Sequence, residues 1–344
     1  MIVKPRLLFV KFIVRFVLLL IIALLSGRPR GLTQPSPLPD SRNFDGPAEL
    51  PRQYVTSSLK DTPAHGKTLA VRSNQDFTQA LASVACGDVI ELRAGVTFNG
   101  HPVLPAKECD DSHWIIIRSS APDSDLPPEG DRLTPCYAGV SSLPGRPHWS
   151  CASTRNVLAK IESEHGPSIS FSPGANHYRL IGLEITSTAN ARALVEFIGA
   201  ADHVVFDRVW IHGTAQGETV RGIMLGQTRY IAIVDSFFSD FHCIARSGSC
   251  SDAQAIAGGL GDGPMGPYKI VNNFLEASGE NLMFGGGAAT ATPQDIEVRR
   301  NHMFKPLTWM KGQPGYVGGK DGNPFIVKNL FELKNAQRVL LEGN

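Results

Sequence analysis

The sequence carries almost no excess charge of either sign. Its 33 basic and 32 acidic residues leave a net charge of +1 over 344 residues. No basic surface of the kind that binds nucleic acid is therefore expected, and no overall field attracts a polyanionic substrate, although a local cleft can still be charged. Helical periodicity is also lacking after residue 86, and no G-x-G-x-x-G follows a strand. These absences exclude a TIM barrel and a dinucleotide-binding fold.

A long uninterrupted apolar run is missing as well. The longest candidate, Phe16 to Leu25, is much shorter than the roughly 20 residues that a membrane-spanning helix needs. It follows a basic leader, so residues 1–27 are predicted to be a secretory signal peptide or an uncleaved N-terminal membrane anchor. Either one exports the rest of the chain, to the periplasm, the cell surface or the medium. Residues 28–67 are rich in proline and are expected to form a tether.

Six cysteines fit an oxidising compartment outside the cytoplasm. The favoured pairing joins neighbours along the chain, because each pair then closes a short loop: Cys86–Cys109, Cys136–Cys151 and Cys243–Cys250. Sequence alone cannot exclude the other pairings. For the last pair, the alternative is a metal site that uses His242, Cys243 and Cys250.

One amphipathic helix precedes a series of short strands. Residues 68–71 and 89–92 have the composition of strands, and between them Phe77, Ala80, Leu81 and Val84 recur at helical spacing. Ser73 begins this helix as an N-cap, with Asp76 three residues later. A helix in this position is typical of the cap that closes the open N-terminal end of a solenoid.

Two kinds of strand then alternate down the chain. The first kind ends at glycine, and the glycines of four successive copies, Gly199, Gly226, Gly258 and Gly285, are 27, 32 and 27 residues apart. The second kind follows each copy after a turn. A repeat of about this length, in which each unit buries its apolar face only against its neighbours, indicates a solenoid. We therefore predict one right-handed parallel β-helix over residues 68–344.

Asparagines occupy equivalent positions in successive repeats. Asn273 and Asn301 each follow a strand of the second kind, and Asn344 matches the next copy. Stacked asparagine side chains can satisfy one another and the backbone of the turn, which predicts an interior ladder. The simpler alternative is that asparagine is common in turns. Because residues 340–344 end inside a strand with no closing cap, we also expect the solenoid to continue beyond Asn344 and to be unstable as it stands.

The repeats, together with residues 278–285 (SGENLMFG) and 328–335 (KNLFELKN), resemble bacterial parallel β-helix proteins of the pectin-lyase-like superfamily, in particular a secreted branch without an assigned reaction. The resemblance covers residues 68–344. It implies the fold strongly and the reaction weakly, since the superfamily includes lyases, hydrolases, esterases and adhesins.

In enzymes of that superfamily the substrate lies on the outer face of one parallel sheet, under inserted loops. Alternation places Glu196, Asn281 and Lys334 on this face, and Glu280 at the start of its strand. The predicted catalytic residues are Glu280, Lys320 and Asp262. The predicted substrate-binding residues are Glu196, Asn281, Trp309, Tyr316 and Lys334. Each of these residues can also be an ordinary solvated or turn residue, and Ca²⁺ is expected only if the protein is a lyase.

Characteristic motifs of the superfamily's enzymes are missing. The sequence lacks the paired aspartates and Gly-His-Gly of polygalacturonases, the Arg-x-Pro-x-x-Arg of pectate lyases and the motifs of pectin methylesterases. Two hypotheses remain. The first is an extracellular protein that acts on a polysaccharide as a lyase or hydrolase. The second is a non-catalytic scaffold that binds cell-surface glycans or mediates adhesion.

Overall fold

The computed structural model describes residues 48–244, 250 and 252–344, and these form three parallel sheets. Sheet A contains nine strands: β1 (Thr68–Val71), β2 (Val89–Leu92), β5 (Ile115–Ser119), β8 (Asn176–Ile181), β11 (Ala201–Asp207), β14 (Thr228–Val234), β17 (Tyr268–Val271), β20 (Gln294–Arg299) and β23 (Gln337–Glu342). Sheet B contains seven: β3 (Thr97–Asn99), β6 (Ala159–Ser163), β9 (Leu183–Ser187), β12 (Trp210–His212), β15 (Phe237–Phe241), β18 (Phe274–Ala277) and β21 (His302–Phe304).

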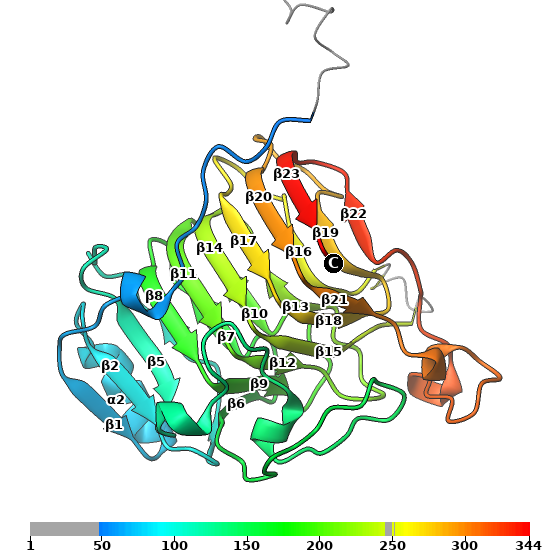
Figure 1. Ribbon diagram of the computed structural model, residues 1–344, viewed down its shortest axis with the longest axis horizontal. Helices are drawn as coiled ribbons and strands as arrows, with labels where there is room; N and C mark the ends of the chain where they lie inside the picture. The colour runs from blue at the N-terminus through cyan, green and yellow to red at the C-terminus, as the bar shows by residue number, and fades with distance from the viewer. Residues whose placement is uncertain (1–47, 245–249, 251) are drawn as a thin grey trace, which may run out of the picture. The chain divides into compact units, whose positions relative to one another are not determined.

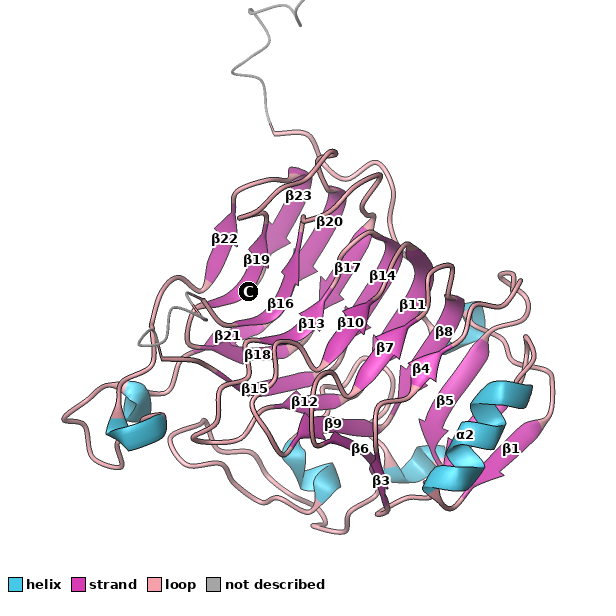
Figure 2. Cartoon of the chain, turned by 180° about the vertical axis from the view of Figure 1, so that it is seen from behind, coloured by secondary structure: helices cyan, strands magenta, loops and turns pink. Residues whose placement is uncertain are grey.

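Sheet C also contains seven strands: β4 (Val103–Leu104), β7 (Ile169–Phe171), β10 (Val195–Phe197), β13 (Arg221–Met224), β16 (Gln254–Gly258), β19 (Glu280–Phe284) and β22 (Phe331–Leu333). From β4 on, the chain visits sheets C, A and B in turn, and each strand pairs in parallel with the equivalent strand of the next coil (Figure 1, Figure 2). This arrangement confirms the predicted parallel β-helix.

Helix α2 (Asn74–Ser83) lies at the N-terminal end of the coils (Figure 1). The side chain of Ser73 accepts a hydrogen bond from the backbone N–H of Asp76 at 3.1 Å, which is the predicted N-cap. Phe77, Ala80 and Leu81 are buried in the core that fills the β-helix. The helix packs on β1 and β3, so it covers apolar surface of the first coil as predicted.

The asparagine ladder is confirmed. The Asn301 Oδ1 atom accepts hydrogen bonds from the backbone N–H and the Nδ2 of Asn273, both at 3.0 Å, and the Oδ1 of Asn344 accepts equivalent bonds from Asn301 at 2.9 Å. Ser236 continues the series, since its N–H donates to Asn273 Oδ1. Each asparagine follows a residue with positive φ, Asn272, Arg300 or Gly343. The left-handed residue makes the bend, and the asparagine satisfies the backbone groups that the bend turns inward.

Residues 51–63, which we call the N-terminal strap, cross the outer face of sheet A (Figure 1). Val55 is buried against Trp114, Val205 and Ala232. The guanidinium of Arg179 is completely buried between the strap and sheet A, where it pairs with Asp207 at 2.7 Å and donates to the carbonyl of Ser57 at 2.9 Å. Apolar contacts and a buried cation therefore hold residues 51–63 of the predicted tether against sheet A.

A long excursion, residues 120–158, covers the outer face of sheet B. It includes the 3₁₀ helices η3 (Asp123–Asp125) and η4 (Pro135–Ala138). Its apolar residues pack on Trp210, Phe237 and Phe274 of sheet B. Arg146 reaches Asp240 and Glu276 at 2.6 Å, and all three side chains are almost completely buried. Two of the three outer faces are thus covered by segments of the same chain.

All three predicted disulfides are present: Cys86–Cys109, Cys136–Cys151 and Cys243–Cys250. The alternative metal site with Cys243 and Cys250 is excluded, because both sulfurs are used in the disulfide bond. The predicted signal or anchor at residues 1–27 lies outside the described residues. Among the residues that the structure does describe, no helix is long and apolar enough to cross a membrane.

Replacing Asn301 by alanine tests the ladder. The change leaves the buried N–H of Asn273 and the carbonyl of Ile270 without a partner. We expect a loss of about 3 kcal/mol in the free energy of unfolding, measured by urea denaturation. Asn99→Ala, at an exposed position in β3, is the matched control and should change stability by less than about 0.5 kcal/mol. Equal effects of the two substitutions would contradict a structural role for the ladder.

Candidate functional site

Sheet C presents a continuous row of side chains on its outer face. Backbone register aligns one position from each of the seven strands in the order Val103, Ser170, Glu196, Met224, Ala257, Met283 and Glu332. Successive members of the row are about 4.8 Å apart, the spacing of neighbouring strands. Their sequence neighbours Val195, Ile223 and Leu282 point into the core. Glu196 therefore faces outward, as alternation predicts.

The N-terminal end of this row is polar. Ser170 Oγ donates to Glu196 Oε1 at 3.0 Å, and His101 Nε2 lies 2.7 Å from the same Oγ. Since the hydroxyl proton is given to Glu196, Nε2 of His101 is the donor in the second bond. His101 also lines a cavity of about 410 Å³ between α2 and residues 99–105. The row thus begins beside a hollow with an ordered hydrogen-bonded chain.

A charged cluster lies where sheet B turns into sheet C, and we call it the corner cluster: Arg221, Asp252, Gln254, Glu280 and Lys328. Lys328 Nζ lies 2.8 Å from Glu280 Oε1 and 2.7 Å from Asp252 Oδ1, so one ammonium bridges two carboxylates. Gln254 Nε2 donates to the other oxygen of Glu280 at 2.8 Å. The Oε1 of Gln254 is buried and has no hydrogen-bond partner among the described residues.

The ion pairs set the protonation of Glu280. Burial alone would raise its pKa, but the hydrogen bonds from Lys328 and Gln254 outweigh burial and hold the pKa below its ordinary value. The pKa of Lys328 is raised by its hydrogen bond to Asp252 and, to a smaller extent, by its hydrogen bond to Glu280. Burial, with the charge of Arg192, lowers the pKa of Arg221. Glu280 is therefore an ionised carboxylate and an unsuitable proton donor.

The three predicted catalytic residues do not come together. Glu280 pairs in register with Gln254 at the start of β16, whereas Asp262 lies in an exposed loop after the end of that strand. The intervening strand alone is about 13 Å long. Lys320 is exposed in the 3₁₀ helix η7 (Lys320–Gly322). Among the described residues, the lysine that pairs with Glu280 is Lys328.

Two predicted substrate-binding residues are buried. Trp309, in the 3₁₀ helix η6 (Leu307–Trp309), is 3% exposed and packs with Ile244 and Phe325, so it is not an open sugar platform. Asn281 is completely buried and donates to the carbonyl of Phe304 on sheet B at 2.8 Å. The expectation that Asn281 points outward is wrong, because β19 begins at a bend where this side chain turns toward sheet B.

The remaining predicted residues are accessible. Lys334 is exposed beside Glu332, at 3.4 Å, near the C-terminal end of the sheet C row. Tyr316 is half-buried, and its hydroxyl donates to the carbonyl of Gly322 within the same insertion. Sequence reasoning missed His101, Ser170 and Lys328. Aligning the copies at the spacing of β7 and β10 would have paired Ser170 with Glu196, but no local pattern marks Lys328.

Replacing Lys328 by methionine should make stability depend differently on pH. In the native protein the lowered pKa of Glu280 stabilises the fold above the ordinary carboxyl value, and this contribution is lost as the pH falls through the lowered pKa. In the variant Lys328 no longer opposes the effect of burial, so the pKa of Glu280 is higher than in the native protein and less of this stabilisation remains.

We expect Lys328→Met to be less stable than the native protein by about 1–2 kcal/mol at pH 7, less than for a fully buried pair because Lys328 is 34% exposed. The difference should shrink toward pH 4, as followed by urea denaturation across pH. Lys334→Met, whose partner Glu332 is less buried, serves as the control. A constant difference at every pH would contradict this electrostatic account.

Comparisons with known proteins add only a general likeness. No protein-family model and no curated protein matches the chain. Among solved structures it is similar to the pectate lyase Pel9A, with 13% identity and a TM-score of 0.44 over 76% of this chain and 59% of that chain. An alginate lyase from Paenibacillus sp. str. FPU-7 gives 14% identity and a TM-score of 0.34 over 79% and 99% of the two chains. The PL6 family alginate lyase AlyGC gives 13% identity and a TM-score of 0.33 over 85% of this chain and 41% of that chain. The chain thus spans about three-fifths of the pectate lyase, and likeness at this level assigns no function.

Proposed function

We propose that this chain is an exported protein that binds an extended polysaccharide along the outer face of sheet C. The proposal rests on how differently the outer faces of the three sheets are covered by other segments of the chain. The N-terminal strap packs on sheet A and residues 120–158 pack on sheet B. In the row on sheet C, Ser170, Ala257 and Met283 are buried, but Val103 is exposed, Glu196, Met224 and Glu332 are half-buried, and the neighbouring Ile198 is 56% accessible. A linear row of positions at a regular spacing suits a linear polymer with repeating units.

The composition of this face suits sugars. Val103, Ile198 and Met224 offer apolar contact, while the second carboxylate oxygen of Glu196 offers a hydrogen-bond acceptor. Lys334, exposed near the end of the row, provides a cation for carboxylate groups. We therefore propose a polysaccharide that contains uronate residues as the ligand.

The corner cluster favours elimination over hydrolysis. A glycosidase needs one protonated carboxyl group and one carboxylate, but Glu280 is held ionised and buried by Lys328. A lyase instead needs a base near the proton beside the uronate carboxylate and positive charge to stabilise the anion that forms. Arg221 is partly exposed, its Nε has no hydrogen-bond partner among the described residues, and its pKa is lowered by burial. We assign Arg221 as the candidate base.

Calcium fits the same cluster. The Nζ of Lys328 is 2.7–2.8 Å from two carboxylate oxygens, close to the Ca²⁺–oxygen distance of about 2.3–2.6 Å. The Oε1 of Gln254, which no described residue contacts through a hydrogen bond, is a third oxygen donor in the same cluster. Glu280, Asp252 and Gln254 would hold the ion if Lys328 moved aside. A bound Ca²⁺ would neutralise the uronate carboxylate.

A non-catalytic glycan-binding scaffold is the second candidate. It is favoured by the separation of Glu280, Lys320 and Asp262, and by the bridging of two carboxylates by Lys328. Such a protein would use the same face of sheet C. The two candidates therefore differ in turnover and agree on where the glycan binds.

A panel of polysaccharides with and without uronate separates the two candidates. Turnover is measured by the ultraviolet absorbance of unsaturated products and by the release of reducing sugar. As a lyase, the protein should release unsaturated products, and Arg221→Ala should lower kcat/KM by about 100-fold or more. Arg93→Ala, at an exposed position after β2, is the matched control. Binding without turnover would support the scaffold, while neither binding nor turnover on any polysaccharide would contradict the proposal.

Calorimetric titration of Ca²⁺ tests the cation site. Lys328→Met should bind Ca²⁺ about tenfold or more tightly than the native protein, since a competing ammonium has been removed from between two carboxylates. Adding Glu280→Gln to this variant should abolish the gain, and Lys334→Met should leave the affinity unchanged. Equal affinity in all four proteins would rule out calcium at the corner cluster.

A further inference from the structure

A second group of polar side chains lies on the outer face of sheet A, far from the sheet C row. His177 of β8 and His203 of β11 occupy equivalent positions in successive coils, and their rings are stacked 4.5 Å apart with 3° between their planes. Asp111, from the loop between β4 and β5, lies 3.2 Å from His177 Nε2. One donor atom from each residue lies within 4.8 Å of the other two.

Each histidine is oriented by the residue before it. His177 Nδ1 lies 2.7 Å from Asn176 Oδ1, and His203 Nδ1 lies 2.6 Å from Asp202 Oδ1. Asn176 uses its Nδ2 on the carbonyls of Lys107 and Gly174, which leaves Oδ1 to face the ring. Both acceptors place a ring proton on Nδ1, which leaves Nε2 of His203 with its lone pair. Nε2 of His177 faces the carboxylate of Asp111, so a metal ion there would take the place of a second ring proton. Metal-binding histidines are held by the same type of bond.

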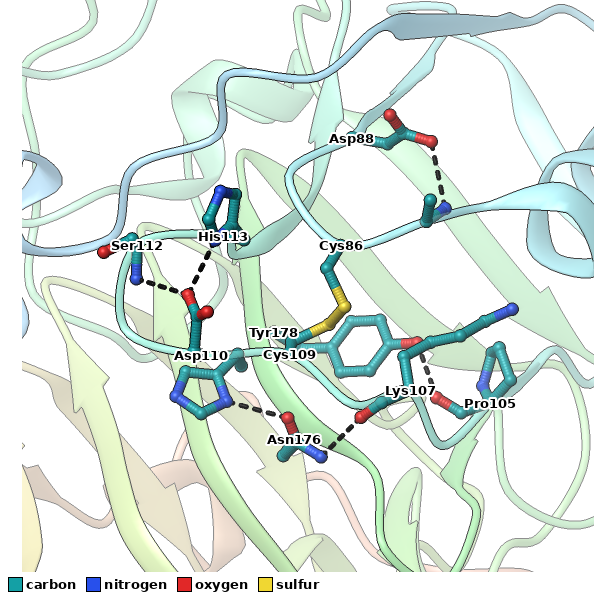
Figure 3. The surroundings of a disulfide bond; sticks show 12 residues. Cys86, Asp88, Pro105, Lys107, Cys109, Asp110, Ser112, His113, Asn176 and Tyr178 are labelled. Carbon is teal, nitrogen blue, oxygen red and sulfur yellow. Dashed lines mark hydrogen bonds and ion pairs between the residues drawn. A yellow bond between two sulfur atoms is a disulfide. The ribbon is translucent and has the colours of Figure 1, made fainter.

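The loop that carries Asp111 is fastened to the sheet (Figure 3). The Cys86–Cys109 disulfide holds it two residues before Asp111, and the hydroxyl of Tyr178 donates to the carbonyl of Pro105 at 2.7 Å. The neighbouring Asp110 is already engaged by His113 and by the N–H of Ser112. Asp111 itself is 86% exposed, so its carboxylate can reorient.

We propose that Asp111, His177 and His203 form a site for a divalent transition-metal ion of the Zn²⁺ type. Two imidazoles and one carboxylate suit Zn²⁺ and exclude Ca²⁺, which prefers oxygen ligands. The stacked rings must tilt toward each other to share an ion. His203 is 30% exposed and would turn within its stack between His177 and Tyr230. Solvent completes the coordination. The ion would clamp the loop of residues 105–113 onto sheet A.

Aromatic rings enclose this site. Tyr230 stacks on the far side of His203 at 4.5 Å and closes the row with an aromatic ring. Trp114 lies edge-on to His177 at 5.1 Å. The site therefore has apolar walls and one open, solvent-facing side at Asp111.

Calorimetric titration of ZnCl₂ into untagged protein, with excess CaCl₂ present to occupy the corner cluster, tests the proposal. The native protein should bind one ion, and Zn²⁺ should raise its Tm. His203→Gln and Asp111→Asn should each weaken binding by about tenfold or more, and Asp202→Asn, which alters only the orienting partner, by about tenfold.

His113→Gln is the matched control, because His113 also pairs with an aspartate in the same loop but is not part of the cluster. Circular dichroism establishes that each variant is folded. Loss of binding in the three site variants with unchanged binding in His113→Gln would establish the site. The same affinity in all five proteins, or no saturable binding to the native protein, would overturn it.

Discussion

Parallel pairing between successive coils is the constraint on which the rest of this structure depends. Each coil buries its apolar side chains only against the coils above and below, and the backbone register repeats from one coil to the next. A side chain at one position therefore lies directly beside its equivalent in the neighbouring coil. The asparagine ladder, the stacked histidines and the sheet C row all follow from this register.

Buried arginines fix the segments that depart from the repeat. Arg179 joins the N-terminal strap to Asp207 of sheet A, and Arg146 joins residues 120–158 to Asp240 and Glu276. Burying charge is costly, and such pairs contribute little net stability. They do define where each segment lies, because either arginine without its partner would be a buried, uncompensated charge. As a result, segments of the same chain cover the outer faces of sheets A and B.

The sequence predicted the features that recur in every coil, and it missed the contacts that occur only once in the chain. Glycine-ended strands at regular spacing predicted the coils, and the matched contexts of Asn273, Asn301 and Asn344 predicted the ladder. Alternation failed at Asn281, because it assumes a straight strand and β19 begins at a bend. It also could not show that Trp309 packs inside its own insertion, or that Lys328 takes the place beside Glu280. Those contacts join parts of the chain that are not related by the sequence repeat.

A crystal structure of the protein with CaCl₂ and an oligouronide tests the central claim most directly, namely that the outer face of sheet C is the binding surface. The account predicts an extended ligand along the row from Ser170 to Glu332, with a cation between Glu280 and Asp252 that contacts one uronate carboxylate, and with Arg221 beside the neighbouring C–H group. A ligand bound against sheet A or sheet B, with Lys328 still bridging the two carboxylates and sheet C empty, would contradict it.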